Sequence, residues 1–197
     1  TIHELNESEC WVRIKRGDKT PLPKQLSVDV GGPVSAKALA AALGRVAEDA
    51  LLGFPLYPLA REILTRQPPA FFDRAPGQPV IQNSQDLEAD LCRAALNLNR
   101  SFLFIQGPPG TGKTYYSARM IVHLIRHGRR VGVSANSHQA INNLLRQVEK
   151  AADGQNVKFQ GIKKFTDETD KFPDGLFIRN VNVLRESDVE ADLIAGT

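Results

Sequence analysis

The spacing of apolar positions changes from helical to strand-like near the middle of the chain. After Ser84, a residue type that caps helices, apolar residues recur at the helical period at Leu87, Leu91, Ala94, Ala95 and Leu98. Residues 101–106, "SFLFIQ", instead form a continuous apolar run, which is typical of a strand buried on both faces of a parallel sheet. Helical, strand-like and helical patterns follow at about 112–127, 129–135 and 138–152. This alternation predicts an α/β fold with a parallel sheet flanked by helices and right-handed crossovers.

The rest of the chain carries weaker signals. Alternating apolar residues at 9–15 and 25–30 predict a β-hairpin or barrel fragment. A helix is expected between a Ser35 cap and a Gly53 stop, and a second helix over 59–67. At the other end of the chain, three short strands are expected, over 156–162, 176–180 and 191–196.

A proline-rich stretch at 68–79 separates the hairpin and helices expected before it from the α/β pattern that starts after Ser84, and it predicts a connector. We therefore expect an accessory segment over 1–72, a connector over 73–82 and an incomplete α/β domain over 83–197. At 197 residues the chain can bury a sizeable core without covalent cross-links.

Composition excludes several classes of protein. Apolar residues make up 42% of the chain and charged residues 24%, the balance of an ordinary globular protein. Cys10 and Cys92 lie far apart, which argues against a disulfide scaffold or a zinc cluster and favours a reducing compartment. No apolar run reaches about 18 residues, so we expect no membrane partner and an intracellular, cytoplasmic location. No feature of the sequence indicates an oligomeric state.

Charge is unevenly distributed. Residues 99–148 contain no Asp or Glu. The same stretch carries seven cations: Arg100, Lys113, Arg119, Arg126, Arg129, Arg130 and Arg146. A polyanionic partner is therefore expected there, with a solvated basic helix face as the alternative for any single arginine.

The residues between the predicted strand at 101–106 and the following helix have the spacing of a Walker A phosphate-binding loop. Its residues, with Tyr115 directly behind them, are Gly107, Pro108, Pro109, Gly110, Thr111, Gly112, Lys113 and Thr114. Glycines let backbone N–H groups approach phosphate oxygens, and a helix start adds unpaired donors and the positive end of a dipole. We expect this set to bind ATP. Lys113 would contact the β and γ phosphates, and the Thr114 hydroxyl would ligate Mg²⁺. Tyr115 has two open interpretations, packing on the nucleotide or packing in the core.

Three stretches resemble superfamily 1 helicases of the 1B-type branch, which includes the nonsense-mediated-decay helicase and nuclease-helicase fusions. "IQGPPGTGKT" resembles motif I, and "VSANSHQAINNLL", 133–145, resembles motif Ia. The latter implies that Ser134, Asn136, Ser137 and His138 hold the backbone of single-stranded nucleic acid. "QNSQ" resembles the Q motif and implies that Gln85 reads the adenine edge. Helix capping by Asn136 or Ser137, and an ordinary first-turn role for Gln85, remain alternatives.

The resemblance implies the ATP-binding part of a motor that hydrolyses ATP to translocate on and unwind nucleic acid, together with a second RecA-like domain. We expect DNA in preference to RNA. Residues 1–72 have an approximate likeness to the segments that precede this core in bacterial RecB-like nuclease-helicase fusions. No apolar strand ending in Asp-Glu follows Lys113. We therefore expect a piece of the first RecA-like domain that ends before motif II and lacks turnover alone. The alternatives are an AAA+ type ATPase, since those proteins share "GPPGTGKT", and a non-catalytic ATP-binding switch or scaffold.

Overall fold

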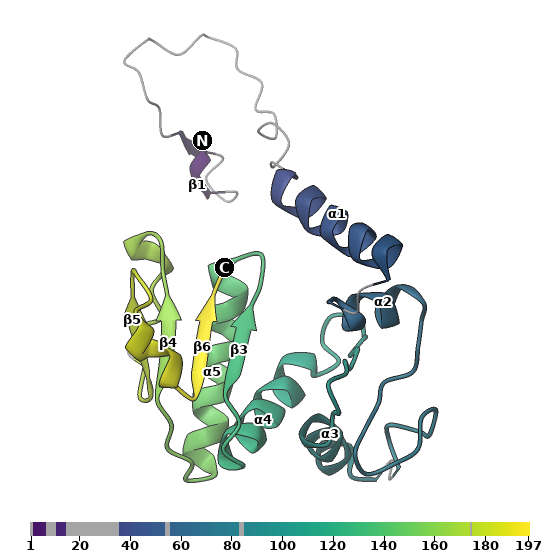
Figure 1. The fold of residues 1–197 in the computed structure, drawn as a ribbon. Coiled ribbons are helices and arrows are strands. Elements are labelled where there is room, and N and C mark those ends of the chain that lie inside the picture. Colours follow the sequence, from purple (N-terminus) through teal and green to yellow (C-terminus); the bar gives the residue numbers. More distant parts are fainter. Residues whose placement is uncertain (1, 7–10, 15–35, 54–55, 83–84, 174) are drawn as a thin grey trace. The chain divides into compact units, whose positions relative to one another are not determined.

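The structure is a computed structural model that describes residues 2–6, 11–14, 36–53, 56–82, 85–173 and 175–197 (Figure 1). The elements, in chain order, are β1 Ile2–Asn6, β2 Trp11–Ile14, α1 Lys37–Leu52, α2 Pro58–Leu64, α3 Leu87–Leu96, α4 Lys113–Arg126, β3 Val131–Ser134, α5 His138–Gly154, β4 Gly161–Lys164, the 3₁₀ turn η1 Glu168–Asp170, β5 Ile178–Val181, the 3₁₀ turn η2 Glu186–Glu190 and β6 Leu193–Gly196. Contacts divide the chain into two units, Thr1–Tyr57 and Pro58–Thr197. This division falls ahead of the connector expected at 73–82.

The first unit contains a hairpin and a helix. β1 and β2 pair antiparallel, with Asn6 opposite Trp11. The strand expected at 9–15 is therefore confirmed over 11–14, but its partner is β1, and 25–30 lie outside the described residues. α1 confirms the predicted helix and its stop, because Gly53 adopts a left-handed φ of 73° and donates its N–H to the Asp49 carbonyl. The N-cap position is Ala36, while Ser35 lies outside the described ranges.

A four-stranded parallel sheet is the centre of the second unit. Its order is β3-β6-β4-β5, with Val133 beside Ala195 and Gly161 beside both Leu193 and Ile178. The strands expected at 129–135, 176–180 and 191–196 are confirmed. β4 begins at Gly161 and overlaps the strand expected at 156–162 only at its end.

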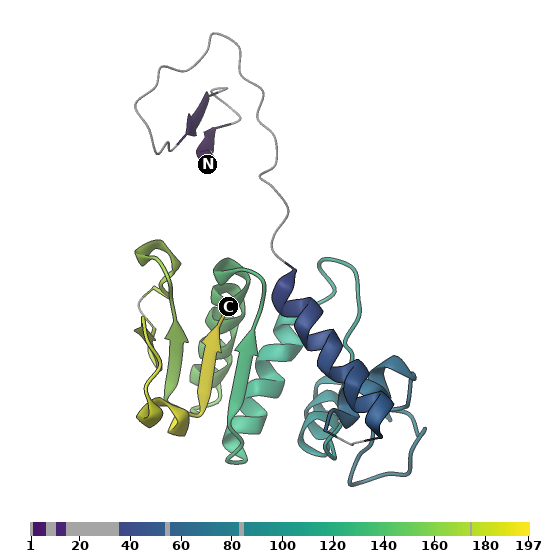
Figure 2. The same cartoon turned by 45° about the horizontal axis from the view of Figure 1, so that its top comes forward.

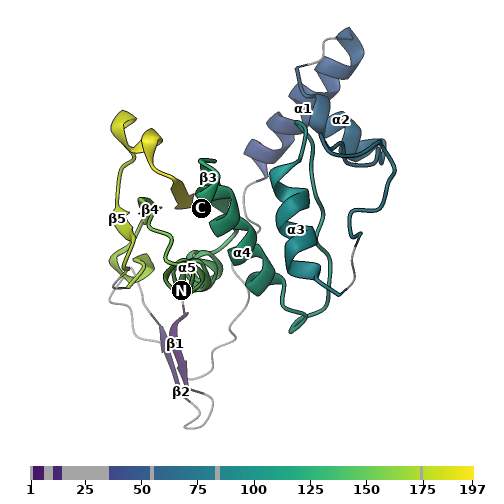
Figure 3. The same cartoon turned by 90° about the horizontal axis from the view of Figure 1, so that it is seen from below.

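Helices α4 and α5 pack together against one side of this sheet (Figures 2 and 3). Val131 and Val133 of β3 pack on the core, whereas Gly132 and Ser134, which alternate with them, are exposed. The buried core comes from α4, α5, the strands and the loops around them: Ala118, Ile121, Val122, Ile125, Ile141, Leu145, Val148, Ala151, Ala152, Phe159, Phe172, Ile178, Leu193 and Ala195. The parallel sheet with flanking helices predicted from the sequence is thus present, in the form of an incomplete RecA-like phosphate-binding fold.

The strand predicted at 101–106 is wrong. The segment carries no strand assignment in the structure, and Phe104 is 71% exposed. A strand needs a neighbour that accepts and donates its backbone hydrogen bonds, and no described strand lies beside this segment in the sheet order. Its apolar side chains pack partly on one another instead, with the Phe102 and Phe104 ring centroids 5.2 Å apart.

Helix α3 begins later than the sequence suggests. Its N-cap is Asp86, whose side chain accepts a hydrogen bond from the Ala89 N–H at 3.0 Å, and Ser84 lies outside the described residues. A carboxylate at this position also suits the positive end of the helix dipole. After α3 ends, Leu98 forms an isolated antiparallel bridge with Phe71, which fastens the segment just before the expected connector to the end of α3.

Candidate functional site

The segment from Gly107 to Gly112 curls back on itself. Gly110 and Gly112 have left-handed φ angles of 84° and 80°, which other residues adopt only with strain. The Thr111 hydroxyl donates to the Pro108 carbonyl at 2.8 Å and closes the turn. The predicted loop conformation, with glycines at its turning points, is therefore present.

Lys113 is the first residue of α4, and its side chain reaches over this loop. The ammonium Nζ donates to the carbonyl oxygens of Gly107 at 2.5 Å and Pro108 at 2.6 Å. The cation is thus held above the loop backbone by two neutral acceptors. Phosphate oxygens would be stronger acceptors for the same protons, because a charged pair forms a stronger hydrogen bond than a charged and a neutral group.

The start of α4 has the electrostatic character of an anion site. No side chain in the described part of the chain caps it, and its first turn contains no acidic residue. The first backbone N–H groups of a helix have no intrahelical acceptor and lie at the positive end of its dipole. Gly107 passes so close to the turn that an added Cβ would lie 2.5 Å from the Thr111 Oγ1. This narrow backbone cradle with open donors fits the phosphate groups of a nucleotide.

A cavity of about 760 Å³ opens in front of the loop and the helix start. Loop and α4 residues line one side, and Asn143, Arg146 and Gln147 of α5 line the other. The described lining contains two cations, Lys113 and Arg146, and no carboxylate. Asn143 and Gln147 were missed from the sequence, and Arg146 was named only as a cation of the basic stretch, although the spacing of all three places them on one helix face opposite the core positions.

The side chain of Tyr115 is held between α4 and α3. Its hydroxyl donates to the Glu88 carboxylate at 3.4 Å, and the Arg119 guanidinium lies 3.4 Å from the ring centroid. Arg119 also pairs with Glu88 at 2.8 Å. The aromatic ring is therefore engaged with protein groups, while Tyr115 still lines the cavity in front of the loop. Thr114, beside it, is exposed in the first turn of α4.

A second, mainly apolar cavity of about 470 Å³ lies on the other side of the loop. Val80, Ile81 and Leu87 line it together with residues 103–108, Leu91, Thr111, Lys113 and Tyr116. The Asp90 carboxylate accepts the Gln82 N–H at 2.5 Å and fastens this part of the connector to α3. Gln85 is an exposed residue just before the Asp86 cap and is not part of the lining of either cavity.

The four residues expected to hold a nucleic-acid strand lie at the carboxyl end of β3 and the start of α5. Ser134 and Asn136 are exposed. Ser137 is the N-cap of α5, with its hydroxyl accepting the Ala140 N–H at 3.2 Å, so the capping alternative describes its side chain. Open parallel sheets bind ligands at this edge, where the strands end.

His138 takes part in a polar network that the sequence did not indicate. Its Nδ1 lies 2.7 Å from the Nζ of Lys163, which also donates to the Lys164 carbonyl at 2.6 Å. Because an ammonium can only donate, Nδ1 accepts and Nε2 carries the proton. The Nε2 lies 3.4 Å from an Asp170 carboxylate oxygen and 3.3 Å from the Thr197 hydroxyl. Both imidazole nitrogens therefore have protein partners.

Lys163 is fully buried at the end of β4, with 0% of its surface exposed. Burial lowers the pKa of this ammonium, and the nearby Asp170 carboxylate opposes part of that effect. The lysine connects β4 to the start of α5 through His138. A buried lysine at the carboxyl edge of a sheet has no local sequence signature, which is why this residue was missed.

Comparison with known proteins gives matches in the same region. A family model described as "AAA domain" matches residues 82–167, which contain the loop, α4, β3 and α5. A Drosophila melanogaster protein named "Regulator of nonsense transcripts 1 homolog" is 36% identical over 90 residues, 45% of this chain and 7% of that protein. A Takifugu rubripes protein named "Putative regulator of nonsense transcripts 1" is 46% identical over 54 residues, 27% of this chain and 5% of that protein. No solved structure matches.

These similarities support a helicase-like ATPase module of the superfamily 1 kind in the region they cover. The chain spans less than a tenth of the length of either relative. In the described part of the chain, no helix has both the length and the apolar composition of a membrane span.

Proposed function

We propose that this chain is the ATP-binding part of a superfamily 1 helicase that couples ATP hydrolysis to movement along, and unwinding of, nucleic acid. One observation carries the proposal. A curled glycine loop, the Lys113 ammonium and an uncapped helix start all face one cavity lined by cations. A triphosphate is the common ligand whose charge and size suit this combination.

Each loop residue has a distinct role in this proposal. Backbone N–H groups of the loop and of the α4 start hold the phosphate oxygens, and Lys113 transfers its hydrogen bonds from the loop carbonyls to the β and γ phosphates. The hydroxyl of Thr114, which is exposed, would ligate Mg²⁺, and the ion would neutralise charge on those phosphates. The apolar cavity beside the loop offers a surface for the adenine ring, and Gln85, just before α3, would read its edge.

The nucleic-acid contacts are assigned to the edge where β3 ends and α5 begins. Exposed Ser134 and Asn136 would donate to phosphate or sugar oxygens, and the start of α5 adds backbone N–H groups through Ser137 and His138. The preference for DNA expected from the sequence has no support in the comparisons. The names of both relatives refer to transcripts, so we propose a single-stranded nucleic acid and treat RNA as the first polymer to test.

The activity of the whole protein requires more than the loop. We propose an accessory segment over 1–72, a connector over 73–82 and a partial RecA-like domain over 83–197. The parent protein would add a second RecA-like domain. We also propose an intracellular, cytoplasmic location for this protein. The exposed apolar run at Phe104 supports the view that other strands complete the sheet. Phosphoryl transfer depends on groups that position water and neutralise charge, and we expect negligible ATPase activity from this chain alone.

Titration of a fluorescent ATP analogue with Mg²⁺ tests the nucleotide site. Lys113→Ala should weaken binding roughly tenfold or more, because charge-assisted hydrogen bonds are worth about 1.5–3 kcal/mol each. Lys158→Ala is the control, since it removes the same charge from an exposed lysine that lines neither cavity beside the loop. Equal affinities of the two variants would reject the nucleotide site.

Measurement of phosphate release tests the remaining claims. The purified chain should show no steady turnover, with or without a strand, whereas a longer parent protein should hydrolyse ATP and be stimulated by single strands. Binding without hydrolysis in the longer protein would point to a nucleotide switch in place of a motor.

A further inference from the structure

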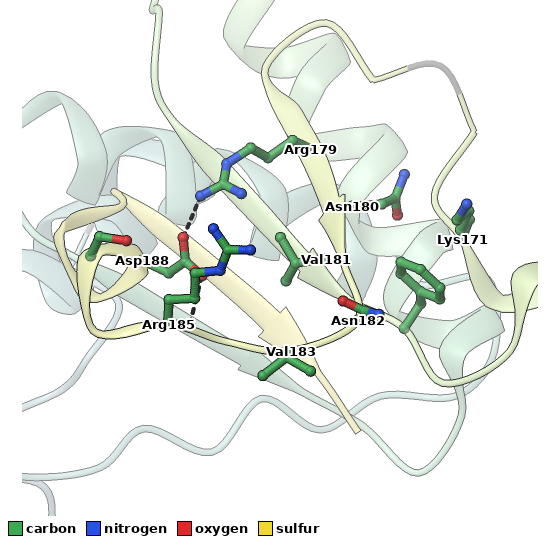
Figure 4. Close-up of a pocket in the computed structure, with 10 residues that line it drawn as sticks. Lys171, Arg179, Asn180, Val181, Asn182, Val183, Arg185 and Asp188 are labelled. Atoms are coloured by element: carbon green, nitrogen blue, oxygen red, sulfur yellow. Dashed lines mark hydrogen bonds and ion pairs between the residues drawn. The ribbon is translucent and has the colours of Figure 1, made fainter.

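A cleft of about 530 Å³ lies where β5 ends and η2 begins, outside the sites described above (Figure 4). Its lining is mostly polar and cationic: Phe165, Lys171, Arg179, Asn180, Asn182 and Arg185, with Asp188 beneath. Figure 4 shows Arg179, Arg185 and Asp188 at one end, Lys171 and Asn182 at the other, and Val181 between them. Three cations and two amides around one hollow suit an anionic ligand with several hydrogen-bond acceptors.

Among the described residues that line the cleft, the one carboxylate already has protein partners. Asp188 is 4% exposed, accepts the Arg185 backbone N–H at 2.8 Å and forms an ion pair with Arg179. These two contacts lower the pKa of Asp188 and keep it charged. Asp188 therefore holds the backbone at residue 185 and the Arg179 guanidinium in position. Arg185 is exposed and its guanidinium forms no ion pair of contact length within the described residues, although its positive charge also helps to lower the pKa of Asp188.

The opposite end of the cleft is only weakly neutralised. The Lys171 ammonium pairs with Glu168 at 2.6 Å and lies 4.8 Å from the centroid of the Phe165 ring. The Glu168 side chain is 79% exposed, and exposed ion pairs of this kind contribute little. A phosphate can therefore replace Glu168 as the partner of Lys171 at small cost.

The cleft is connected, through shared lining residues, to the region at the end of β3 and the start of α5 that is proposed above to bind a nucleic-acid strand. Lys171 also lines a neighbouring cavity of about 500 Å³ together with His138, Asn142 and Arg146. The Asp170 carboxylate lies in the same lining and is paired with His138 at 3.4 Å. Arg146 and Asn143 in turn line the cavity in front of the phosphate loop. Shared lining residues thus connect three hollows in a row: Lys171 joins the first two, and Asn143 and Arg146 join the second to the third.

We propose that the β5–η2 cleft binds the phosphodiester backbone of a single nucleic-acid strand that continues past the start of α5, with Arg185 as its main phosphate contact. The inference rests on the proposed function and extends the strand path beyond the positions that the motifs cover. A row of connected hollows with cations at intervals fits a polymer of phosphates better than one small anion. One guanidinium group can donate two parallel hydrogen bonds to two oxygens of the same phosphate, which suits an exposed arginine on a fixed backbone.

Fluorescence anisotropy with labelled oligo(U) and oligo(dT), at two salt concentrations, tests the proposal on the full 197-residue chain. Arg185→Ala should weaken binding about tenfold and reduce the slope of log affinity against log salt by about one, since one phosphate contact is lost. Arg61→Ala removes the same charge from an exposed position on α2 that lines none of the three hollows, and should change affinity less than about twofold. Thermal unfolding of both variants checks that the fold is retained.

The possible results separate this inference from the function on which it rests. If the wild type binds strands and the two arginine variants behave alike, the cleft is not part of the path, while the proposed function stands. If the wild type binds ATP analogue but no strand, the nucleic-acid part of the proposed function fails together with this inference. If Arg185→Ala loses only the binding of a polyglutamate competitor, the cleft is a site for acidic peptide and the inference is overturned.

Discussion

Gly107→Ala is the sharpest test of the loop geometry. A Cβ at this position would lie 2.5 Å from the Thr111 Oγ1, whereas real Cβ atoms almost never approach another heavy atom more closely than 3.0 Å. The two atoms must therefore move apart by about 0.5 Å. Thr111 cannot yield easily, because its β-branched side chain is stiff and its hydroxyl is bonded to the Pro108 carbonyl at 2.8 Å.

The cost follows from this overlap. Overpacking of a close contact costs about 1–3 kcal/mol, and if the bound loop bears that cost, nucleotide affinity falls roughly 5- to 150-fold. Adding Thr111→Ala removes the Oγ1 and leaves the Thr111 Cβ position 3.5 Å away, an ordinary contact. The double variant should therefore bind better than Gly107→Ala alone, although it also loses the hydrogen bond to Pro108, worth about 0.5–1.5 kcal/mol.

Titration with a fluorescent ATP analogue measures the nucleotide affinity of the wild type, Gly107→Ala and the double variant. Gly132→Ala is the control. An added Cβ at Gly132 meets nothing within 4 Å, and the residue is exposed on β3. The reasoning is refuted if Gly107→Ala binds within twofold of the wild type, or if Thr111→Ala fails to improve it. A loop that rearranges freely would produce either result.

Three further predictions concern buried groups. Leu145→Ala, at a site with 0% exposure, should lower the free energy of unfolding by about 2–5 kcal/mol in urea titrations. Leu176→Ala, at a site with 71% exposure, should change it by less than about 0.5 kcal/mol. Similar losses in the two variants would contradict the core assignment. Because burial lowers the pKa of Lys163 below its ordinary 10.5, the unfolded chain binds the proton more strongly in the window between the two values, and stability should rise with pH there. Lys163→Met should flatten that rise in urea titrations at several pH values, and an unchanged slope would argue against burial. Burial raises the pKa of Cys92 to about 11, so in a Cys10→Ser background its thiol should react with Ellman's reagent at least about a hundredfold more slowly than a free thiol, and fast reaction of the folded chain would refute this.

The helices around the phosphate loop were predictable because their signals are local. Gly110 and Gly112 adopt left-handed conformations that depend on the residue itself, and α4 starts directly behind them. The ends of α1 and α4 likewise follow from left-handed Gly53 and Gly128. Caps were less predictable, since Asp86 and the serine two residues before it are both suitable types, and the choice depends on where the chain enters the helix.

The segment at 101–106 shows the limit of pattern reading. Its apolar run correctly indicates residues that favour burial, yet Phe104 remains largely exposed because no described strand lies beside it. The same limit applies to β1, whose pairing with β2 was not anticipated. A residue pattern states a preference for extended backbone, but hydrogen bonding to a neighbour depends on segments far away in the chain.

The residues of the candidate site also fall into two groups, those that local sequence identifies and those that only the fold brings together. The glycine spacing and the position of Lys113 at a helix start are properties of a few consecutive residues, so the printed sequence was enough to locate the loop. The approach of Lys163 to His138, and the gathering of Lys171, Arg179 and Arg185 around one cleft, required the fold. Backbone conformation is decided within a turn or two of chain, whereas cavities and buried contacts form only when packing of the core brings distant segments together.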